Sequence, residues 1–389
     1  MKNQRHISFI QITLILSSIF VIMNFLSSPK LLNQLDNKAT FLKEEKTSDS
    51  INPSQFTSMT LDPKEFRKFN HPFPCIGKSS QQQSQGGVGF HYIKVHKTAS
   101  STVAHIVKYI SNRRGRCLEY SNHSPAHEFL GLSNRIPNQN NSYLFTFVRE
   151  PTKRAVSDFF YRKVTQDHEE VNLENFQNGC CRSKQGLNGQ AGYQLAYIST
   201  DEKLPEYTFW KYSDPNKVQN PKLLLSRINN AFDTYDFIGV SERLNESLVA
   251  LSFLLDLSIT EIAYVSYRQS GSYLEINKRC IKIVESHVTS DIEDYVETEE
   301  WKAKTAGDKL LHETAMAALD NTIDNVIGRE TFQARLKRYE VMLKQMTKCE
   351  TECSSSCTST GEYRGAMSCR PCMNRVRKEW EDGMTLTIE

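Results

Sequence analysis

The sequence predicts an α/β fold with a mostly parallel sheet flanked by helices, and three segments carry the prediction. Residues 88–108 and 143–163 each have the pattern of a strand, a short loop and a helix. Residues 237–257 repeat this pattern, with a strand at 237–240 and a helix at 244–257. The short apolar run at 143–148 is typical of a buried parallel strand.

The first segment, Val88–Lys108, begins with β-branched and aromatic residues, which favour a strand. A loop of small and hydroxylic residues, HKTASST, follows at 96–102. Because Ser and Thr cap helix N-termini, we expect a helix to start inside this loop. Apolar residues then recur at helical spacing: Val103, Ile106, Val107 and Ile110.

This loop has the chemistry of an anion site. The first N–H groups of a helix lack intrahelical partners and lie at the positive end of its dipole. Lys97 adds a mobile cation, and hydroxyl donors come from Ser100, Ser101 and Thr102. The glycines of a Walker A motif are missing. The loop therefore predicts phosphate or sulfate binding; the alternative is an ordinary capped helix with a surface lysine.

The second segment ends its strand with Arg149-Glu150-Pro151, and a pattern R-E-P-x-x-R-x-x-S closes at Ser157. Pro151 suits the first turn of a helix. The planar fork of Arg149 matches the geometry of a phosphate, which a lysine cannot do. Taken alone, Arg149 could be a surface charge at a strand end. A second anion site about fifty residues after the first argues against that reading.

These residues resemble the PAPS-dependent sulfotransferases, whose co-substrate is 3′-phosphoadenosine 5′-phosphosulfate. K-T-A-S-S-T at 97–102 resembles their 5′-phosphosulfate loop, and R-E-P-x-x-R-x-x-S resembles their 3′-phosphate element, with Glu150 replacing the usual Asp. The G-x-x-E segment Phe237–Leu248 resembles Golgi carbohydrate sulfotransferases. The best match is the galactose 3-O-sulfotransferase group, with uronyl 2-O-sulfotransferases as near relatives, over 88–346.

The resemblance implies a P-loop nucleotide-kinase-like sheet and a set of site roles. Lys97 would stabilise negative charge on the leaving nucleotide. Arg149 and Ser157 would hold the 3′-phosphate. The 5′-phosphate would be held by Lys97, Thr98, Ser100, Ser101 and Thr102. The scheme requires PAPS and no metal. A weaker match, N-x-Q-x-x-Y ending at Tyr193, is similar to a segment near the acceptor cleft of some relatives.

Transfer to a sugar hydroxyl also needs a base that takes the acceptor proton. Histidine suits this task because its pKa is near neutral. The segment 117–132 holds two histidines, and relatives have a histidine upstream of the 3′-phosphate strand. His127 fits best by spacing and His123 is the second candidate, with Glu128 as a third.

The N-terminal part predicts a membrane anchor. Ile7–Leu26 is twenty residues without a charge, enough for one bilayer core, and the basic residues before it place the N-terminus in the cytosol. A cleaved signal peptide is the alternative. We therefore expect a cytoplasmic tail at 1–6, an anchor at 7–26, a stem at 27–87, a sulfotransferase domain at 88–346 and a Cys-rich tail at 347–389.

Five of the ten cysteines lie in the tail, at positions 349, 353, 357, 369 and 372. In a cytosolic protein this pattern could bind zinc. Behind a signal anchor the compartment is oxidising, so disulfides are favoured. The odd number requires that at least one pairs outside the tail, with Cys75 or Cys280 as candidates, or stays free. Three glycosylation sequons, at Asn122, Asn140 and Asn245, fit a lumenal domain.

The function predicted from these observations is sulfuryl transfer from PAPS to a carbohydrate hydroxyl by a single-pass type II Golgi membrane protein. A net charge of +3 gives no reason to expect a nucleic-acid partner. The acceptor and a homo-oligomeric state are left open. The polar segment 164–235 is expected to build the acceptor side. Two alternatives are a lumenal kinase that uses ATP and a non-catalytic membrane-anchored glycan-binding protein with the same fold.

Overall fold

The computed structural model describes residues 64–68, 89–114, 118–120, 126, 142–179, 193–199, 221–265, 271–276, 279–349, 356–358, 360–364 and 370–383. The chain divides into two compact units, Met1–Asn52 and Pro53–Glu389, and every described residue belongs to the second. The predicted anchor 7–26 lies outside these ranges. Within them, no helix combines the length and apolar character needed to cross a membrane.

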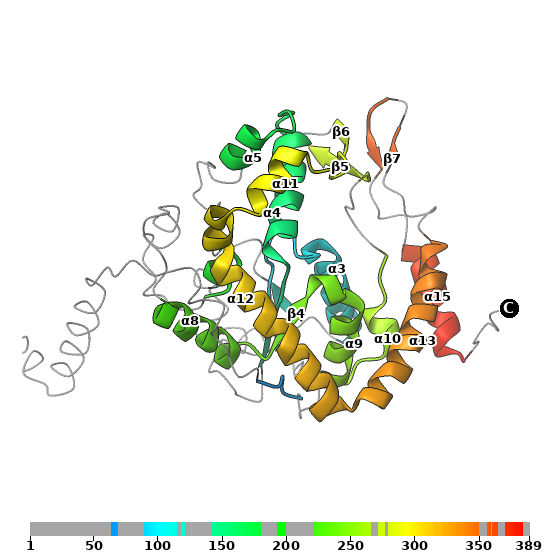
Figure 1. Cartoon of the computed structure of the whole chain (residues 1–389). Coiled ribbons are helices and arrows are strands. Elements are labelled where there is room, and N and C mark those ends of the chain that lie inside the picture. The colour runs from blue at the N-terminus through cyan, green and yellow to red at the C-terminus, as the bar shows by residue number, and fades with distance from the viewer. Residues whose placement is uncertain are drawn as a thin grey trace, which may run out of the picture. The chain divides into compact units, whose positions relative to one another are not determined.

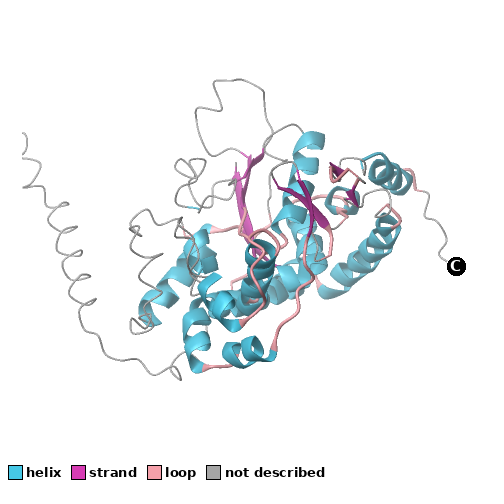
Figure 2. Cartoon of the chain, turned by 90° about the horizontal axis from the view of Figure 1, so that it is seen from above, coloured by secondary structure: helices cyan, strands magenta, loops and turns pink. Residues whose placement is uncertain are grey.

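A four-stranded sheet, all of whose pairings are parallel, forms the centre of the second unit (Figure 1). Its order is β2-β1-β3-β4, from β1 (Gly89–Ile93), β2 (Leu118–Tyr120), β3 (Ser142–Val148) and β4 (Phe237–Val240). Helices lie alongside the strands (Figure 2). The predicted α/β class and parallel sheet are confirmed.

Three of these strands, β1, β3 and β4, are buried and consist mostly of apolar residues. Ile93, Val148 and Val240, the last residues of β1, β3 and β4, are fully buried. Gly239 in β4 faces its register partner Phe147, whose ring would lie 2.5 Å from a Cβ at position 239. A side chain there would displace this ring, so the glycine lets β3 and β4 pack closely.

The helix that follows the first loop, α3 (Ser100–Arg114), starts inside the hydroxylic loop as predicted. Helix α9 (Leu244–Leu254) follows β4 through the short 3₁₀ turn η6 (Ser241–Arg243) and packs against that strand. α9 ends three residues before the predicted Leu257. The short helix α10 (Ile259–Ile262) then contacts α3.

A long helix, α12 (Glu299–Asn321), also packs against β4 and continues as the π-helix η7 (Thr322–Ile327). The helical spacing of Leu311, Ala315 and Ala318 predicts a helix over 306–327. α12 begins seven residues before 306, because Thr298 caps it and Trp301 is buried in its first turn. A glycine directly after 327 predicts the end of this helix. Gly328 does end η7, with a φ of 88°, and α13 (Arg329–Thr347) follows.

A second apolar cluster forms beside the main core. It joins α4 (Pro151–Phe159), the π-helix η5 (Phe160–Val164), α5 (Leu173–Gly179) and α11 (Ser290–Val296). Rings of Phe159, Phe176 and Trp301 meet at its centre. The polar segment 164–235 also contains α6 (Tyr193–Ile198) and α8 (Pro221–Thr234), and its acceptor role stays a prediction.

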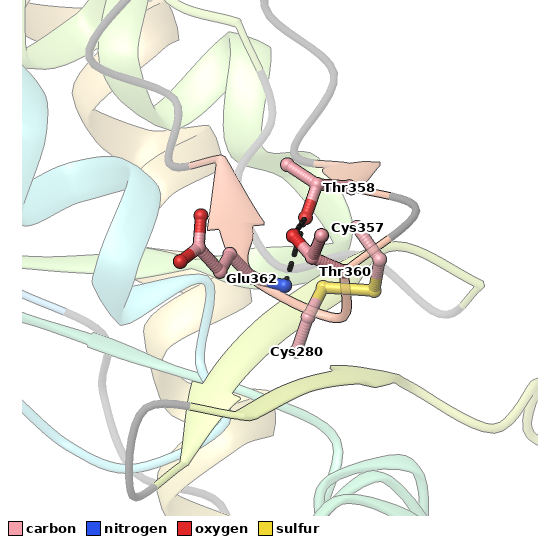
Figure 3. The surroundings of a disulfide bond; sticks show 5 residues. All are labelled: Cys280, Cys357, Thr358, Thr360 and Glu362. Atoms are coloured by element: carbon pink, nitrogen blue, oxygen red, sulfur yellow. Dashed lines mark hydrogen bonds between the residues drawn. A yellow bond between two sulfur atoms is a disulfide. The ribbon is translucent and has the colours of Figure 1, made fainter.

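Two disulfides tie the C-terminal part together, so the prediction of disulfides is confirmed for four cysteines. Cys280–Cys357 connects the hairpin β5–β6 (Tyr273–Ile276, Arg279–Lys282) to the hairpin β7–β8 (Ser356–Cys357, Tyr363–Arg364) (Figure 3). The Cys280 N–H also donates to the Gly361 carbonyl at 3.1 Å. Cys280 was one of the two partners expected outside the tail. Cys349–Cys372 connects the end of α13 to α15 (Arg370–Glu381).

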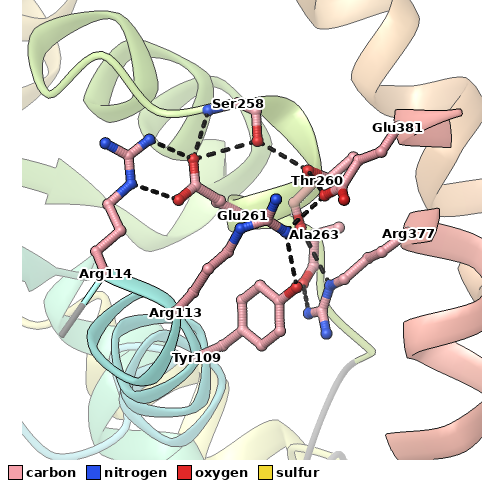
Figure 4. A network of polar contacts seen from close by, with 9 residues as sticks. All are labelled: Tyr109, Arg113, Arg114, Ser258, Thr260, Glu261, Ala263, Arg377 and Glu381. Atoms are coloured by element: carbon pink, nitrogen blue, oxygen red, sulfur yellow. Dashed lines mark hydrogen bonds and ion pairs between the residues drawn. The ribbon is translucent and has the colours of Figure 1, made fainter. Parts of the chain in front are cut away.

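A polar network fastens α15 to the C-terminal end of α3 and to α10 (Figure 4). Arg377 donates to the carbonyls of Thr260 (3.1 Å) and Ala263 (2.7 Å). Arg114 binds Glu261 through two hydrogen bonds of 2.6 and 2.7 Å. The network holds α3 at its C-terminal end, while its N-terminal end follows the predicted anion loop.

The Cys349–Cys372 bridge is expected to stabilise this attachment. Closing a loop with a sequence separation of 23 restricts the unfolded chain by roughly 3 kcal/mol. We expect the Cys349→Ala/Cys372→Ala double variant to lose about this free energy of unfolding, measured with urea. The control is wild-type protein unfolded with and without a reductant. An unchanged free energy would show that packing alone holds α15.

Candidate active site

The loop between β1 and α3 has an unusual backbone. Lys97 and Ala99 both have left-handed φ values, 65° and 57°. Each such non-glycine residue costs about 1–2 kcal/mol, a strain that is typical of functional sites. The Thr98 hydroxyl donates to the Val95 carbonyl at 3.1 Å, so its side chain braces the loop from within. Ser100 and Thr102 are buried in the first turn of α3, and Ser101 is half-buried.

Arg149 follows the end of β3 and reaches across to this loop. Its Nη1 donates to the Lys97 carbonyl at 3.1 Å. Burial lowers the pKa of Arg149 below its usual value, and the charge of nearby Glu242 offsets part of this lowering. Within the described part of the chain, its Nη2 makes no hydrogen bond. The two predicted anion motifs, about fifty residues apart in sequence, therefore meet at the carboxyl edge of the sheet.

Gln194, from α6, holds the backbone of Arg149 on both sides. Its side-chain oxygen accepts the Arg149 N–H at 2.8 Å, and its side-chain nitrogen donates to the Arg149 carbonyl at 2.7 Å. Asp308 of α12 in turn accepts the N–H groups of Gln194 and Leu195 at 3.0 Å. Burial raises the pKa of Asp308, and these backbone hydrogen bonds oppose the rise.

Glu242 lies beside Arg149 at the end of β4. Its carboxylate accepts the Glu150 N–H at 3.2 Å, pairs with Arg149 Nε at 3.7 Å and contacts His312 Nε2 at 3.1 Å. Partial burial raises the pKa of Glu242, but the hydrogen bonds from His312 and from backbone N–H groups lower it overall. Glu242 is therefore ionised near neutral pH and orients the Arg149 guanidinium.

Glu150, which stands where the resembled sulfotransferases usually have Asp, has a clear structural role. Glu150 caps α4, accepting the N–H groups of Thr152 at 3.0 Å and Lys153 at 2.6 Å. The longer side chain therefore still satisfies the first turn of the helix. Ser157 lies half-buried farther along α4, and within the described part of the chain it makes no hydrogen bond to Arg149.

The side chain of Lys97 lies against an aromatic residue. Its Nζ is 4.0 Å from the ring centroid of Tyr161, which belongs to η5. His96 meets the ring of Tyr197 at 5.9 Å between centroids. The base candidates His123, His127 and Glu128 lie outside the described residues. Among those described, no group of three or more His, Cys, Asp or Glu side chains could hold a metal ion.

Sequence reasoning missed Gln194, Asp308 and His312. One signal could have found Asp308: it precedes Leu311 by three residues and Ala315 by seven, so a carboxylate stands on the apolar stripe of a predicted helix. Buried carboxylates require hydrogen-bond partners. Gln194 and His312 carry no comparable local signal.

Gln194 is expected to be essential for the geometry at Arg149. In Gln194→Leu, the N–H and the carbonyl of Arg149 lose their hydrogen-bond partners. This loss should lower the free energy of unfolding by about 2–4 kcal/mol. Urea unfolding measures the loss. The matched control is Gln177→Leu at an exposed position of α5. Equal stability of the two variants would contradict the assigned hydrogen bonds.

The comparison with protein families agrees with this geometry. Residues 86–278 match the model of the sulfotransferase family. Searches of curated proteins and of solved structures found no match. The matched range includes the loop at 96–102, Arg149, Gln194 and Glu242, whereas Asp308 and His312 follow it. The segment 86–278, which carries most of the candidate site, is therefore similar to the sulfotransferase family.

Proposed function

We propose that the protein transfers a sulfuryl group from PAPS to a hydroxyl of a carbohydrate acceptor. The single observation that carries this proposal is the hydrogen bond between Arg149 Nη1 and the Lys97 carbonyl. It joins a loop rich in N–H and hydroxyl donors to a guanidinium whose Nη2 has no hydrogen bond among the described residues. PAPS carries two phosphate groups on one ribose, at the 3′ and 5′ positions, and two adjacent anion sites suit such a ligand.

In this scheme each group of the site has one task. The N–H groups and hydroxyls at Ser100, Ser101 and Thr102 hold the 5′-phosphate, and Thr98 shapes their loop. Arg149 holds the 3′-phosphate, with Ser157 as its predicted partner. The bond between sulfur and the bridging oxygen breaks, and its electron pair stays with the nucleotide. Lys97 stabilises that charge.

The acceptor side completes the balance of the reaction. A new bond forms between sulfur and the acceptor oxygen, and the hydroxyl proton passes to a base. His127 is the first candidate for this base, followed by His123 and Glu128. A galactose 3-hydroxyl is the acceptor that the resemblance favours, on a glycolipid, a glycoprotein glycan or a polysaccharide.

We also propose that the protein is a single-pass type II Golgi membrane protein with its catalytic domain in the lumen. The disulfides Cys280–Cys357 and Cys349–Cys372 support an oxidising compartment. The uncharged segment 7–26 supports the anchor. Protease protection of the domain in intact Golgi vesicles is the expected result, and digestion without detergent would contradict it.

Nucleotide binding tests the proposed function most directly. Calorimetry with the full-length protein should show tighter binding of adenosine 3′,5′-bisphosphate than of ADP or ATP, because only the bisphosphate occupies both anion sites. Equal binding of ATP would favour the kinase alternative. Binding of the bisphosphate without transfer from PAPS to any of a panel of glycans would favour a glycan-binding protein.

A further inference from the structure

The Lys97 ammonium has a specific aromatic neighbour that the proposed mechanism does not use. Its Nζ lies 4.0 Å from the ring centroid of Tyr161, within the range in which a cation is attracted to an aromatic face. Both side chains are half-buried. Partial exclusion of water strengthens this attraction compared with a fully exposed pair.

The fold places Tyr161 at this position through the helix that also carries Ser157. Helix α4 changes into the π-helix η5 at Phe160. Buried Phe159 and Phe160 anchor this junction, and Phe159 packs edge-on against Phe176 at 5.4 Å between ring centroids. Tyr161 follows Ser157 by four residues, so the two lie on one side of the helix. Short π-helical segments frequently occur at functional sites.

Lys97 therefore has a fixed backbone and a separately held side-chain end. Arg149 donates a hydrogen bond to the Lys97 carbonyl at 3.1 Å, and the Lys97 φ of 65° sets the direction in which the lysine side chain leaves the loop. A lysine side chain has a flexible four-carbon stem, so a fixed backbone alone does not position its charge. The ring of Tyr161 supplies a contact that positions the ammonium itself.

We propose that Tyr161 is a positioning residue for Lys97, which holds the ammonium at the nucleotide site through a cation–π contact. The kinetic consequences rest on the proposed sulfuryl transfer, but the contact itself does not. Without the ring, the ammonium samples more rotamers and stabilises the leaving nucleotide less often. The Tyr161 hydroxyl has no part in this role, so a phenylalanine should replace the tyrosine.

The contact is tested by carbon-13 reductive methylation of the lysines in the full-length protein, followed by NMR. The signal that disappears in Lys97→Arg identifies Lys97. We expect this signal to be shifted upfield by the aromatic ring in wild type and in Tyr161→Phe, and to lose the shift in Tyr161→Leu. Tyr109→Leu is the matched control, because it removes a cation–π contact with Arg377 elsewhere. An unshifted wild-type signal would overturn the proposal, even if Tyr161→Leu failed to fold.

Kinetics then test the positioning role. Tyr161→Leu should lower kcat about tenfold with a nearly unchanged KM for PAPS, whereas Tyr161→Phe and Tyr109→Leu should keep the wild-type kcat. Equal losses in Tyr161→Phe and Tyr161→Leu would reject the cation–π role. A shifted Lys97 signal in a protein that does not use PAPS would reject the proposed function and leave the contact intact.

Discussion

Lys97→Ala is expected to lower kcat for sulfuryl transfer by roughly a thousandfold, the upper range for loss of one charge-stabilising group. The ammonium is the cation placed to stabilise charge on the leaving nucleotide. The fold should be retained, because alanine has the same Cβ as lysine and meets the same strain at a φ of 65°. The measurement is the single-turnover rate with saturating PAPS, together with urea unfolding.

A matched variant distinguishes the loss of the Lys97 charge from the loss of a lysine charge elsewhere on the protein. Lys108→Ala removes an exposed lysine from α3, away from the loop, and should leave both rate and stability unchanged. Lys97→Arg keeps a positive charge but replaces a compact ammonium by a planar fork, so its rate should fall between wild type and Lys97→Ala. A wild-type rate in Lys97→Ala would refute the proposed mechanism.

The sequence predicted the elements whose signals are local. The strand at 237–240, the start of α3 in the hydroxylic loop and the stop at Gly328 follow from periodicity, caps and backbone freedom within a few residues. The strand β2 was missed, because three residues are too short to show a period. The early start of α12 was missed because it depends on burial of Trp301, a tertiary effect.

For the candidate site, too, the residues with local sequence signals were predicted and those that depend on tertiary packing were missed. The anion motifs are contiguous in sequence, so Lys97 and Arg149 could be identified before their contact was known. The groups that hold Arg149 in place are far from it in the sequence. Gln194 lies 45 residues from Arg149, and Asp308 lies 114 residues from Gln194. Such pairings depend on how α6 and α12 pack, and no local pattern encodes that packing.

Arg149→Ala is expected to weaken binding of adenosine 3′,5′-bisphosphate by about 10- to 100-fold, the range for a hydrogen bond to a charged group. The same change should raise the KM for PAPS much more than it lowers kcat. The matched control is Arg329→Ala, which removes an exposed arginine paired with Asp324 on the surface. Calorimetry measures both variants against wild type.

The Arg149 side chain also holds the Lys97 carbonyl, so weaker binding alone would not identify its ligand group. Adenosine 5′-monophosphate separates the two roles, because it lacks the 3′-phosphate but still occupies the loop. If Arg149 binds the 3′-phosphate, Arg149→Ala weakens the bisphosphate far more than the monophosphate. If Arg149 only braces the loop, both ligands lose the same factor and the 3′-phosphate assignment is wrong. Arg149→Lys should recover only part of the difference, since an ammonium restores the charge but not the fork.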